Sequence, residues 1–284
     1  GMRPKSCRIQ SGVKVDSDIP ASSNQLSPCL LYHKVTSKWE AGVTWTPPDQ
    51  FKRLMSAFHF DGWKTINPDS IFQCTTEPVP EKGKKFLLCF DDGYECTYTD
   101  AYPILERFDY KPMIFIPSGF IGKNNDWDHH LLGRHFNHLN LEQLKVLIRA
   151  GWVIGSHTVT HRALTNLSDL EIKHELSESK KQLEALFNIQ VDWVSFPFGR
   201  YNKRILEIAR EIGYKGAVVH ILRHNCVIDD FILWSGDAVY RWDSNKLIHR
   251  RLYRKPGYRL GKLFRVCVNW FSGCTLVWKR LFSS

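Results

Sequence analysis

Residues 85–93 read Lys-Phe-Leu-Leu-Cys-Phe-Asp-Asp-Gly, an apolar run that ends in two adjacent carboxylates and a glycine. A second apolar run, Trp-Val-Ile-Gly-Ser at residues 152–156, passes directly into His-Thr-Val-Thr-His at residues 157–161. Carboxylates and imidazoles that close apolar strands beside glycines are typical of a metal site at the mouth of an α/β sheet or barrel. These two stretches therefore predict both the fold class and the place of its chemistry.

Strand and helix patterns alternate along the chain, as in parallel α/β proteins. The expected strands are residues 28–33, 85–90, 113–116, 152–155, 191–196, 217–219 and the region 235–243. The expected helices are residues 46–58, 98–108, 141–150, 168–187 and 202–212, and residues 119–140 form an irregular loop over the site. About seven strands over roughly 220 residues favour a (β/α) barrel over an open sheet.

The charge distribution divides the chain into three parts. Residues 1–26 are polar and Ser-rich, and we expect them to be poorly ordered. Residues 27–245 form the expected catalytic barrel. Residues 246–284 form a basic tail with ten Lys/Arg and no Asp/Glu, so it carries the whole net charge of +10. A nucleic-acid-binding domain would spread such charge over its fold, so we expect no nucleic-acid partner.

The tail has the pattern of an amphipathic helix over residues 262–282. Its basic residues lie opposite a wide Trp/Phe/Leu face, which favours a helix in a membrane interface. The alternative is a C-terminal helix docked on the barrel or in a dimer. No secretory signal follows Met2, and no apolar run reaches the roughly 20 residues needed to span a bilayer. We therefore expect a cytoplasmic protein, peripheral on the inner face of the membrane.

Eight cysteines are spread along the chain without a CxxC pair. Their even number permits disulfides, but the absence of a framework spacing favours free thiols in a reducing compartment.

Asp91 and Asp92 repel each other unless something offsets their charges, and a bound cation does so. Gly93 permits the bend that lets both side chains converge. The alternative is a turn or a helix N-cap, since Asp-Asp-Gly is also good turn chemistry.

His157 and His161 have the i, i+4 spacing of a helical metal-binding pair. The zinc-protease pattern requires Glu at the second position, where this chain has Thr158, so that interpretation is rejected. The β-branched Thr-Val-Thr interior favours a short turn after a strand instead. The alternative is one surface histidine and one buried histidine.

Asp92, His157 and His161 together form a two-His, one-carboxylate set. That set suits zinc hydrolysis and also non-haem iron oxygenases. Metal-assisted hydrolysis needs a base to take a proton from water, and Asp91 meets that need. A third segment, Phe-Pro-Phe-Gly-Arg-Tyr-Asn at residues 196–202, is either an apolar wall beside a substrate or a plain strand–helix turn.

The order and spacing of these segments resemble the polysaccharide deacetylases of carbohydrate esterase family four, over roughly residues 28–245. The three motifs are matched by residues 90–93, 157–161 and 196–199. The resemblance implies a distorted (β/α) barrel of seven strands. It implies that Asp91 is the catalytic base and that Asp92, His157 and His161 bind a divalent metal, usually zinc. We also expect Pro197, Phe198, Gly199 and the neighbouring Arg200 on the substrate side of the site.

The chain departs from the family pattern in two places. Ser195 stands where many members have arginine, and the late Leu-x-His of the general acid has no clear match. The region 235–243 resembles the final strand of the branch that includes biofilm exopolysaccharide deacetylases. In that branch the acid histidine comes from the first strand, which makes His33 the candidate here. The alternative for His33 is a hydrogen-bonded core histidine.

We therefore expect a metal-dependent hydrolase that removes N-acetyl groups from an N-acetylated sugar, in a polysaccharide or a lipid-linked glycan. Two alternatives stay open on the sequence. One is a non-catalytic glycan- or membrane-binding barrel in which Ser195 reflects a decayed site. The other is an iron oxygenase with the same ligand set.

Overall fold

The computed structural model describes residues 28–40, 42–68, 84–124, 136–220 and 231–253. The N-terminal segment 1–26 and residues 254–284, which include the expected helix at 262–282, lie outside the described residues. Residues 125–135 of the loop expected over the site also lie outside them.

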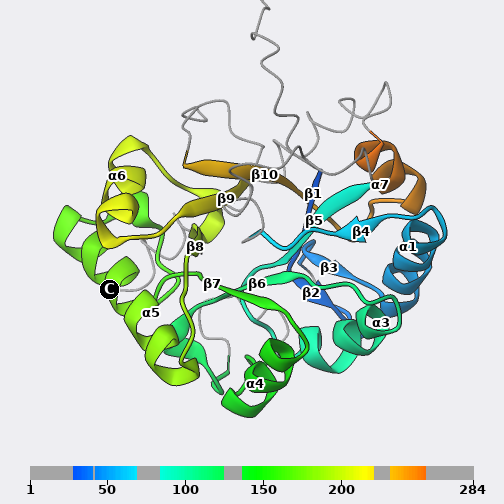
Figure 1. Ribbon diagram of the computed structural model, residues 1–284, viewed down its shortest axis with the longest axis horizontal. Coiled ribbons are helices and arrows are strands. Elements are labelled where there is room, and N and C mark those ends of the chain that lie inside the picture. Colours follow the sequence, from blue (N-terminus) through cyan, green and yellow to red (C-terminus); the bar gives the residue numbers. More distant parts are fainter. Residues whose placement is uncertain (1–27, 41, 69–83, 125–135, 221–230, 254–284) are drawn as a thin grey trace, which may run out of the picture.

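Parallel strands curl into a barrel (Figure 1). The strand order is β1-β10-β9-β8-β7-β6-β5-β4, and β1 also pairs with β5, which closes a ring of all of these strands except β4. The seam between β7 and β8 is thin, with the single register pair Ser156–Val194. The distorted (β/α) barrel of seven strands is confirmed. The sheet strands are β1 (Cys29–Tyr32), β4 (Lys64–Thr65), β5 (Lys85–Phe90), β6 (Met113–Ile116), β7 (Val153–Ser156), β8 (Trp193–Ser195), β9 (Gly216–His220) and β10 (Ile232–Ala238).

Helices flank the barrel, and α1 and α5 begin with the start signals expected from the sequence (Figure 1). The capping box at Ser168 and Glu171 is present at the start of α5. Two short strands, β2 (Lys34–Val35) and β3 (Trp45–Thr46), form a separate parallel pair that the sequence did not predict. The helices are α1 (Pro48–Phe60), α3 (Tyr102–Glu106), α4 (Leu141–Arg149), α5 (Asp169–Phe187), α6 (Lys203–Ile212) and α7 (Asn245–Leu252).

The helix expected at residues 98–108 is not continuous. A π-helical turn, Thr97–Ala101, precedes the short α3. Pro103 has no N–H to donate to the preceding turn, and its ring crowds the carbonyl four residues earlier. A wider turn just before the proline accommodates both effects, which explains why one helical pattern became two elements.

The barrel interior is a small apolar cluster beneath a polar rim. Strand side chains alternate between faces, so the inward rows can be followed to the strand ends. On β5 the inward Leu87 and Cys89 lead to Asp91, and on β8 the inward Trp193 leads to Ser195. The rows therefore converge at the carboxyl ends of the strands, where α/β barrels carry their chemistry. The interior cluster contains Cys29, Leu31, Leu87, Cys89, Met113, Phe115, Trp193 and Val218.

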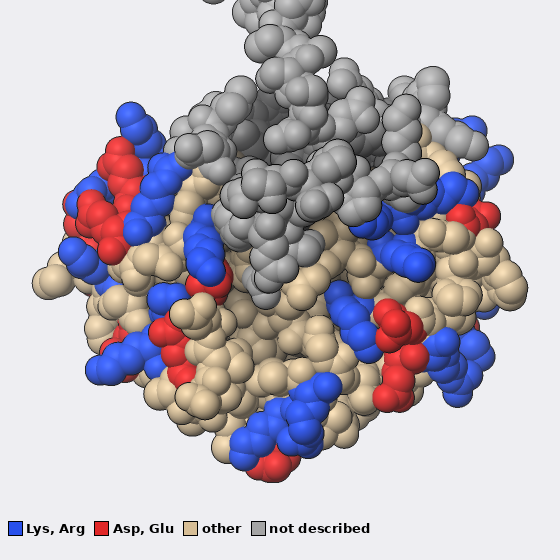
Figure 2. Space-filling view, viewed as in Figure 1, with Lys and Arg blue, Asp and Glu red and all other residues tan. Residues whose placement is uncertain are grey.

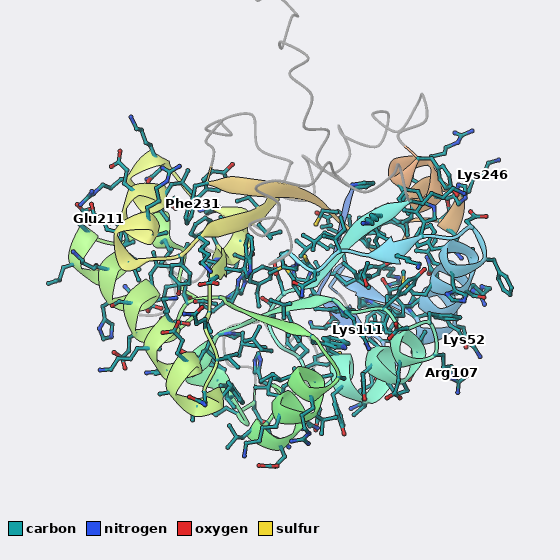
Figure 3. The ribbon with its side chains drawn as sticks, in the orientation of Figure 1. Lys52, Arg107, Lys111, Glu211, Phe231 and Lys246 are labelled. Carbon is teal, nitrogen blue, oxygen red and sulfur yellow. The ribbon has the colours of Figure 1, made fainter. Side chains whose placement is uncertain are left out.

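Charged side chains lie around the outer edge of the helical ring. Lys and Arg alternate with Asp and Glu along this rim, and uncharged residues occupy the middle of the face shown in Figure 2. Lys52, Arg107, Glu211 and Lys246 are examples at the periphery (Figure 3). Within the described ranges, no helix combines the length and the apolar character required to cross a membrane.

Candidate metal centre and active site

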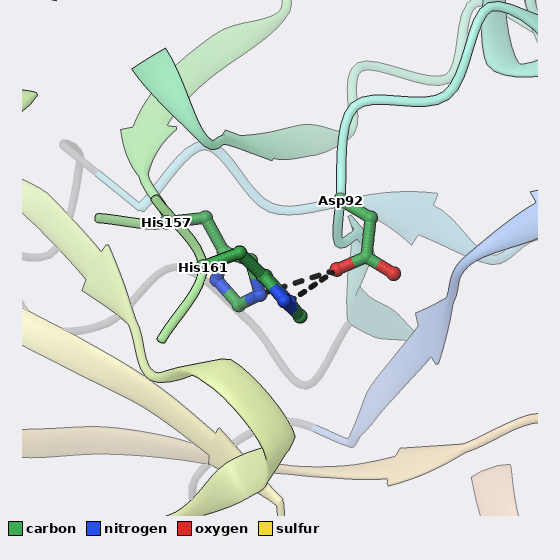
Figure 4. A group of neighbouring side chains, drawn as sticks. All are labelled: Asp92, His157 and His161. Atoms are coloured by element: carbon green, nitrogen blue, oxygen red, sulfur yellow. Dashed lines mark ion pairs between the residues drawn. The ribbon is translucent and has the colours of Figure 1, made fainter. Parts of the chain in front are cut away.

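Asp92, His157 and His161 converge on one point at the carboxyl ends of β5 and β7 (Figure 4). Asp92 Oδ1 lies 3.3 Å from His157 Nε2 and 3.1 Å from His161 Nε2. A tetrahedral site with metal–ligand bonds of about 2.1 Å places its ligand atoms about 3.4 Å apart. All three side chains are buried. Donor type and spacing therefore both fit a divalent metal.

The backbone of the centre is held in left-handed conformations. Asp92 has φ 69°, Thr158 has φ 68° and His161 has φ 56°. Such angles cost an ordinary residue about 1–2 kcal/mol each, and they cluster at functional sites. Strand β5 ends at Phe90, and the chain turns at Asp92 and Gly93. This turn allows the side chains of Asp91 and Asp92 to face the same pocket, although neighbouring strand residues point to opposite faces. The His-Thr-Val-Thr-His segment is a non-helical turn, as its β-branched interior predicted.

The orientation of the His157 ring is set by a backbone group. Its Nδ1 lies 2.9 Å from the carbonyl oxygen of Ser195, so Nδ1 carries the hydrogen and donates it. In the neutral ring, Nε2 is then the unprotonated nitrogen that faces Asp92, and this is the form that a metal binds. Ser195 therefore contributes to the site through its backbone as well as its side chain.

The residues of the metal centre also shift one another's pKa values. Burial works against the charged form of Asp92, but hydrogen bonds from His157 and His161 outweigh it and hold the pKa of Asp92 well below its usual range. Burial likewise disfavours a charged His157, yet the charge of Asp91 and the hydrogen bond to Asp92 raise its pKa. The pocket thus favours an ionised Asp92, and the positive charge that offsets it comes either from ring protons of the histidines or from a cation bound in their place.

Asp91 lies beside the centre with one oxygen held and the other available. Its Oδ2 accepts a hydrogen bond of 3.3 Å from the Ser195 hydroxyl. Its buried Oδ1 has no hydrogen-bond partner among the described residues. Burial raises the pKa of Asp91, against the opposing charges of His157 and His33. A raised carboxyl pKa suits a group that must accept a proton near neutral pH.

His33 follows directly after β1, the strand that pairs with β5. It is half-buried, and its Nδ1 is buried without a hydrogen-bond partner in the described part of the chain. Its charge acts on both carboxyls, lowering the pKa of Asp91 and of Asp92. The structure therefore brings His33 to the same pocket as the two acids.

The third motif forms a turn against the metal centre. Phe198 has φ 59°, and its ring packs edge-on against His161 with centroids 4.8 Å apart. Pro197 is buried, and Gly199 donates its N–H to the Phe196 carbonyl. Arg200 is half-buried, and its Nε has no hydrogen-bond partner among the described residues. The turn thus contacts the metal centre through Phe198, and its role as a wall beside a substrate stays a prediction.

Two supporting residues were missed by sequence reasoning. His138 is buried in the loop before α4, and its Nδ1 lies 2.8 Å from the Asp92 carbonyl oxygen. Nothing in its surrounding sequence marks it. Glu175 is buried on α5, where it accepts hydrogen bonds from the histidine segment. The sequence does mark Glu175, because it stands at a core-facing position of a predicted helix, where a carboxylate requires hydrogen-bond partners.

A family model described as polysaccharide deacetylase matches residues 79–217. Among curated proteins, YxkH of Bacillus subtilis (strain 168), which is named after the same family, is 33% identical over 191 residues, 67% of this chain. Poly-beta-1,6-N-acetyl-D-glucosamine N-deacetylase of Staphylococcus aureus (strain MSSA476) is 27% identical over 138 residues, 44% of this chain. The chain spans 63% and 44% of the lengths of these two relatives.

Solved structures share the fold. The deacetylase PplD of Streptococcus pyogenes, in complex with acetate, superposes with a TM-score of 0.66 at 23% identity, covering 80% of this chain and 97% of that one. IcaB from Ammonifex degensii superposes with a TM-score of 0.65 at 19% identity, covering 79% and 96%. The matched family model and the barrel with its three motifs agree: the chain belongs to the polysaccharide deacetylase family.

Proposed function

We propose that this protein is a metal-dependent hydrolase that removes N-acetyl groups from an N-acetylated sugar in a glycan. The observation that carries the proposal is the buried Asp92–His157–His161 centre with Asp91 beside it. An oxygenase with the same three ligands has no need of a second carboxylate whose free oxygen faces the pocket. The family match also favours hydrolysis over the oxygenase alternative.

Zinc is the ion that we propose for the centre. Two imidazole nitrogens and one carboxylate oxygen, with further positions open, are a ligand set of catalytic zinc sites. A divalent ion bound there supplies Lewis acidity, which polarises the acetamide carbonyl and lowers the pKa of water.

Asp91 acts as the general base in this proposal. Its free Oδ1 takes the proton from the attacking water, while the Ser195 hydroxyl holds Oδ2 in place. Ser195 stands where many family members have arginine, so it gives Asp91 a hydrogen bond without a permanent positive charge. A guanidinium at that place would lower the pKa of Asp91 further and make it a weaker base.

His33 acts as the general acid. Its position after β1, its unpartnered buried Nδ1 and its effect on both carboxyls support this role. Protonated His33 gives its proton to the departing sugar amine, which makes the amine a neutral leaving group. Base and acid then approach the substrate from β5 and β1, which are neighbouring strands.

The substrate that we propose is a polymer of N-acetylated hexosamine. The Staphylococcus aureus relative named above is a poly-beta-1,6-N-acetyl-D-glucosamine N-deacetylase, which supports this class. The apolar wall formed by Pro197 and Phe198 suits the flat face of a sugar ring, and Arg200 offers a donor beside it. A lipid-linked glycan is the second substrate class, and the experiment below tests both.

The experiment measures acetate released by the full-length protein, first stripped of metal and then given zinc. The substrates are β-1,6-linked N-acetylglucosamine oligomers, chitooligosaccharides, peptidoglycan and a lipid-linked N-acetylated sugar. We expect zinc-dependent release from at least one, with the β-1,6-linked oligomers preferred. Asp92→Asn is the control for contaminating esterase. Equal release by wild type and this variant on every substrate contradicts the proposal.

We also propose that residues 262–282 attach the enzyme to a membrane surface. The support comes from the sequence, where basic residues alternate with Trp and Phe. Each Lys or Arg near an anionic leaflet contributes about 1 kcal/mol. Co-sedimentation with vesicles containing phosphatidylserine should retain full-length protein and not a chain truncated after Tyr258. Equal, negligible binding by both chains would contradict the proposal.

A further inference from the structure

Helix α5 carries a polar row on its buried side, facing the loops around the metal centre. Glu175, Ser179 and Gln182 are spaced by four and three residues, so they share one face of the helix. Ser179 accepts a hydrogen bond of 2.8 Å from Ser156 at the end of β7. Gln182 accepts one of 2.7 Å from Ser118. The helix, which packs along β7 in Figure 1, therefore contacts the site through polar groups.

Glu175 makes the most extensive of these contacts. Its Oε2 accepts the backbone N–H groups of Val159 and Thr160, each at 2.9 Å. Its Oε1 accepts the Thr160 hydroxyl. Two successive backbone N–H groups aimed at one anion form a nest, a concavity that selects negative charge. The segment between the two metal-binding histidines is thus wrapped around one carboxylate.

Every backbone N–H of residues 157–161 has an acceptor, and Glu175 supplies two of them. His157 donates to the Ile116 carbonyl, 2.9 Å away. Thr158 donates to the Ser156 hydroxyl at 3.3 Å, and His161 donates to the Thr158 hydroxyl at 3.1 Å. Without Glu175, the two N–H groups in the middle of the turn would lose their acceptor, and the left-handed angles at Thr158 and His161 would lose their support.

The burial of Glu175 is otherwise unfavourable. The residue is 3% exposed, and no Lys or Arg in the described part of the chain forms an ion pair with it. Burying a carboxylate away from cations costs several kcal/mol unless hydrogen bonds replace the lost water. A neutral core residue would pack against β7 without this cost, so helix packing alone does not explain a carboxylate at this position.

We infer that Glu175 is a positioning residue for the metal centre. It holds the turn that places His161 Nε2 opposite Asp92 and His157, and it thereby sets the affinity of the centre for its metal. The inference rests on the proposed metal site, because it assigns Glu175 a role only if these three residues bind an ion. Among the described residues, Glu175 hydrogen-bonds to Val159 and Thr160 and to none of the three ligand side chains.

The test is a zinc titration of the full-length metal-free protein against a chromophoric chelator. Glu175→Ala removes all three acceptor contacts, and we expect zinc affinity to fall about 10–100-fold, the usual effect of losing outer-sphere support. Glu175→Gln keeps an oxygen for the two N–H groups, and its amide can donate to the Thr160 hydroxyl. Zinc affinity of the Gln variant should stay within about threefold of wild type, because geometry is preserved.

Glu184→Ala is the matched control on the same helix. Glu184 accepts the Val191 N–H at 3.0 Å and pairs with Lys180, outside the site. This control should lower thermal stability and leave zinc affinity unchanged. A purely structural role for Glu175 predicts the same result for Glu175→Ala, so wild-type zinc affinity in that variant would overturn the inference.

Two further outcomes are separable. Failure of the wild-type chain to bind zinc would contradict the proposed function itself, and the titration shows this before any variant is compared. If Glu175→Ala does not fold, Glu175→Asp decides, because it keeps the charge and withdraws the carboxylate by one methylene. We expect about tenfold weaker zinc binding for the Asp variant. Unchanged affinity in a folded Asp variant would overturn the inference.

Discussion

The two strand ends that build the metal centre are held by different means. After β5, Asp91 donates its N–H to the Tyr32 carbonyl at 2.9 Å, and the Gly93 carbonyl accepts from Leu139 at 2.8 Å. The His138 side chain adds one contact there, to the Asp92 carbonyl. After β7, four of the five N–H groups of residues 157–161 donate to side-chain oxygens, two of them to Glu175. Backbone contacts survive most substitutions, whereas side-chain contacts do not. Support for the histidines is therefore more sensitive to mutation than support for the acids.

The largest effect should come from separating the two adjacent acids. Asp92→Asn removes a charged ligand, and we expect loss of bound zinc and turnover below detection. Asp91→Asn leaves the ligands intact, so zinc should stay bound while turnover falls about 10²–10⁴-fold, the range of general acid–base help. Elemental analysis and acetate release measure the two properties separately. Near-wild-type turnover in Asp91→Asn would remove it as the base.

His33 tests whether the β1 side of the pocket takes part in the chemistry. We expect His33→Gln to keep zinc and to lower turnover about 10²-fold, since a leaving amine without an acid departs as an anion. The pH profile should lose its limb at high pH in this variant, because that limb reports the protonated acid. A profile identical to that of wild type would place His33 outside the proton transfers.

Alanine substitutions at Gly119 and Gly93 compare the turn after β7 with the turn after β5. A Cβ on Gly119 would lie 2.7 Å from the Val159 carbonyl oxygen, within the histidine turn, and this backbone atom cannot move alone. Gly119→Ala should cost about 1–3 kcal/mol of stability and weaken zinc binding. A Cβ on Gly93 would meet the end of the Ile116 side chain at 2.9 Å, and its φ of +60° adds about 1–2 kcal/mol. Urea midpoints and zinc titrations of both variants measure these effects. Weaker zinc binding in Gly93→Ala than in Gly119→Ala would reverse the comparison.

The smallest effect should come from Ser195. Its hydroxyl makes one hydrogen bond of 3.3 Å to Asp91, and such a bond contributes about 1 kcal/mol. Ser195→Ala should therefore lower kcat about fivefold with little change in KM. Its carbonyl, which orients His157, is unaffected by the substitution, so zinc affinity should not change. A drop beyond a hundredfold would mean that the hydroxyl does more than orient the base.

Much of this arrangement followed from patterns in the sequence. The strands at residues 85–90 and 113–116 and the capped start of α5 lie where their patterns placed them, because period and capping are local properties. The candidate metal ligands were recognisable because their residue types and spacing are rare in combination. The π-helical turn before Pro103 was missed, as was the pairing of β2 with β3, which depends on contacts between segments.

The supporting shell was the least predictable part. His138 stacks on Tyr94 and reaches Asp92 from a loop 46 residues away, a contact that no local pattern encodes. Glu175 lies between Ile172 and Leu176 on the buried side of α5, and that placement was visible as a charge in an apolar stripe. Its partners were not visible, because the turn that it binds exists only once β7 and α5 have packed together.

Among the described residues, apolar side chains pack the interior of the barrel and close it beneath the two acids. Trp193, Phe115 and Leu31 fill the interior beneath Asp91, so nothing can pass through the barrel to its other end. If the proposed function holds, water, sugar and released acetate all use the opening at the carboxyl ends of the strands. A polymeric substrate would then be unable to thread through the barrel. Each sugar would be presented from outside, and the polymer would lift or slide across the opening before the next acetyl group is reached.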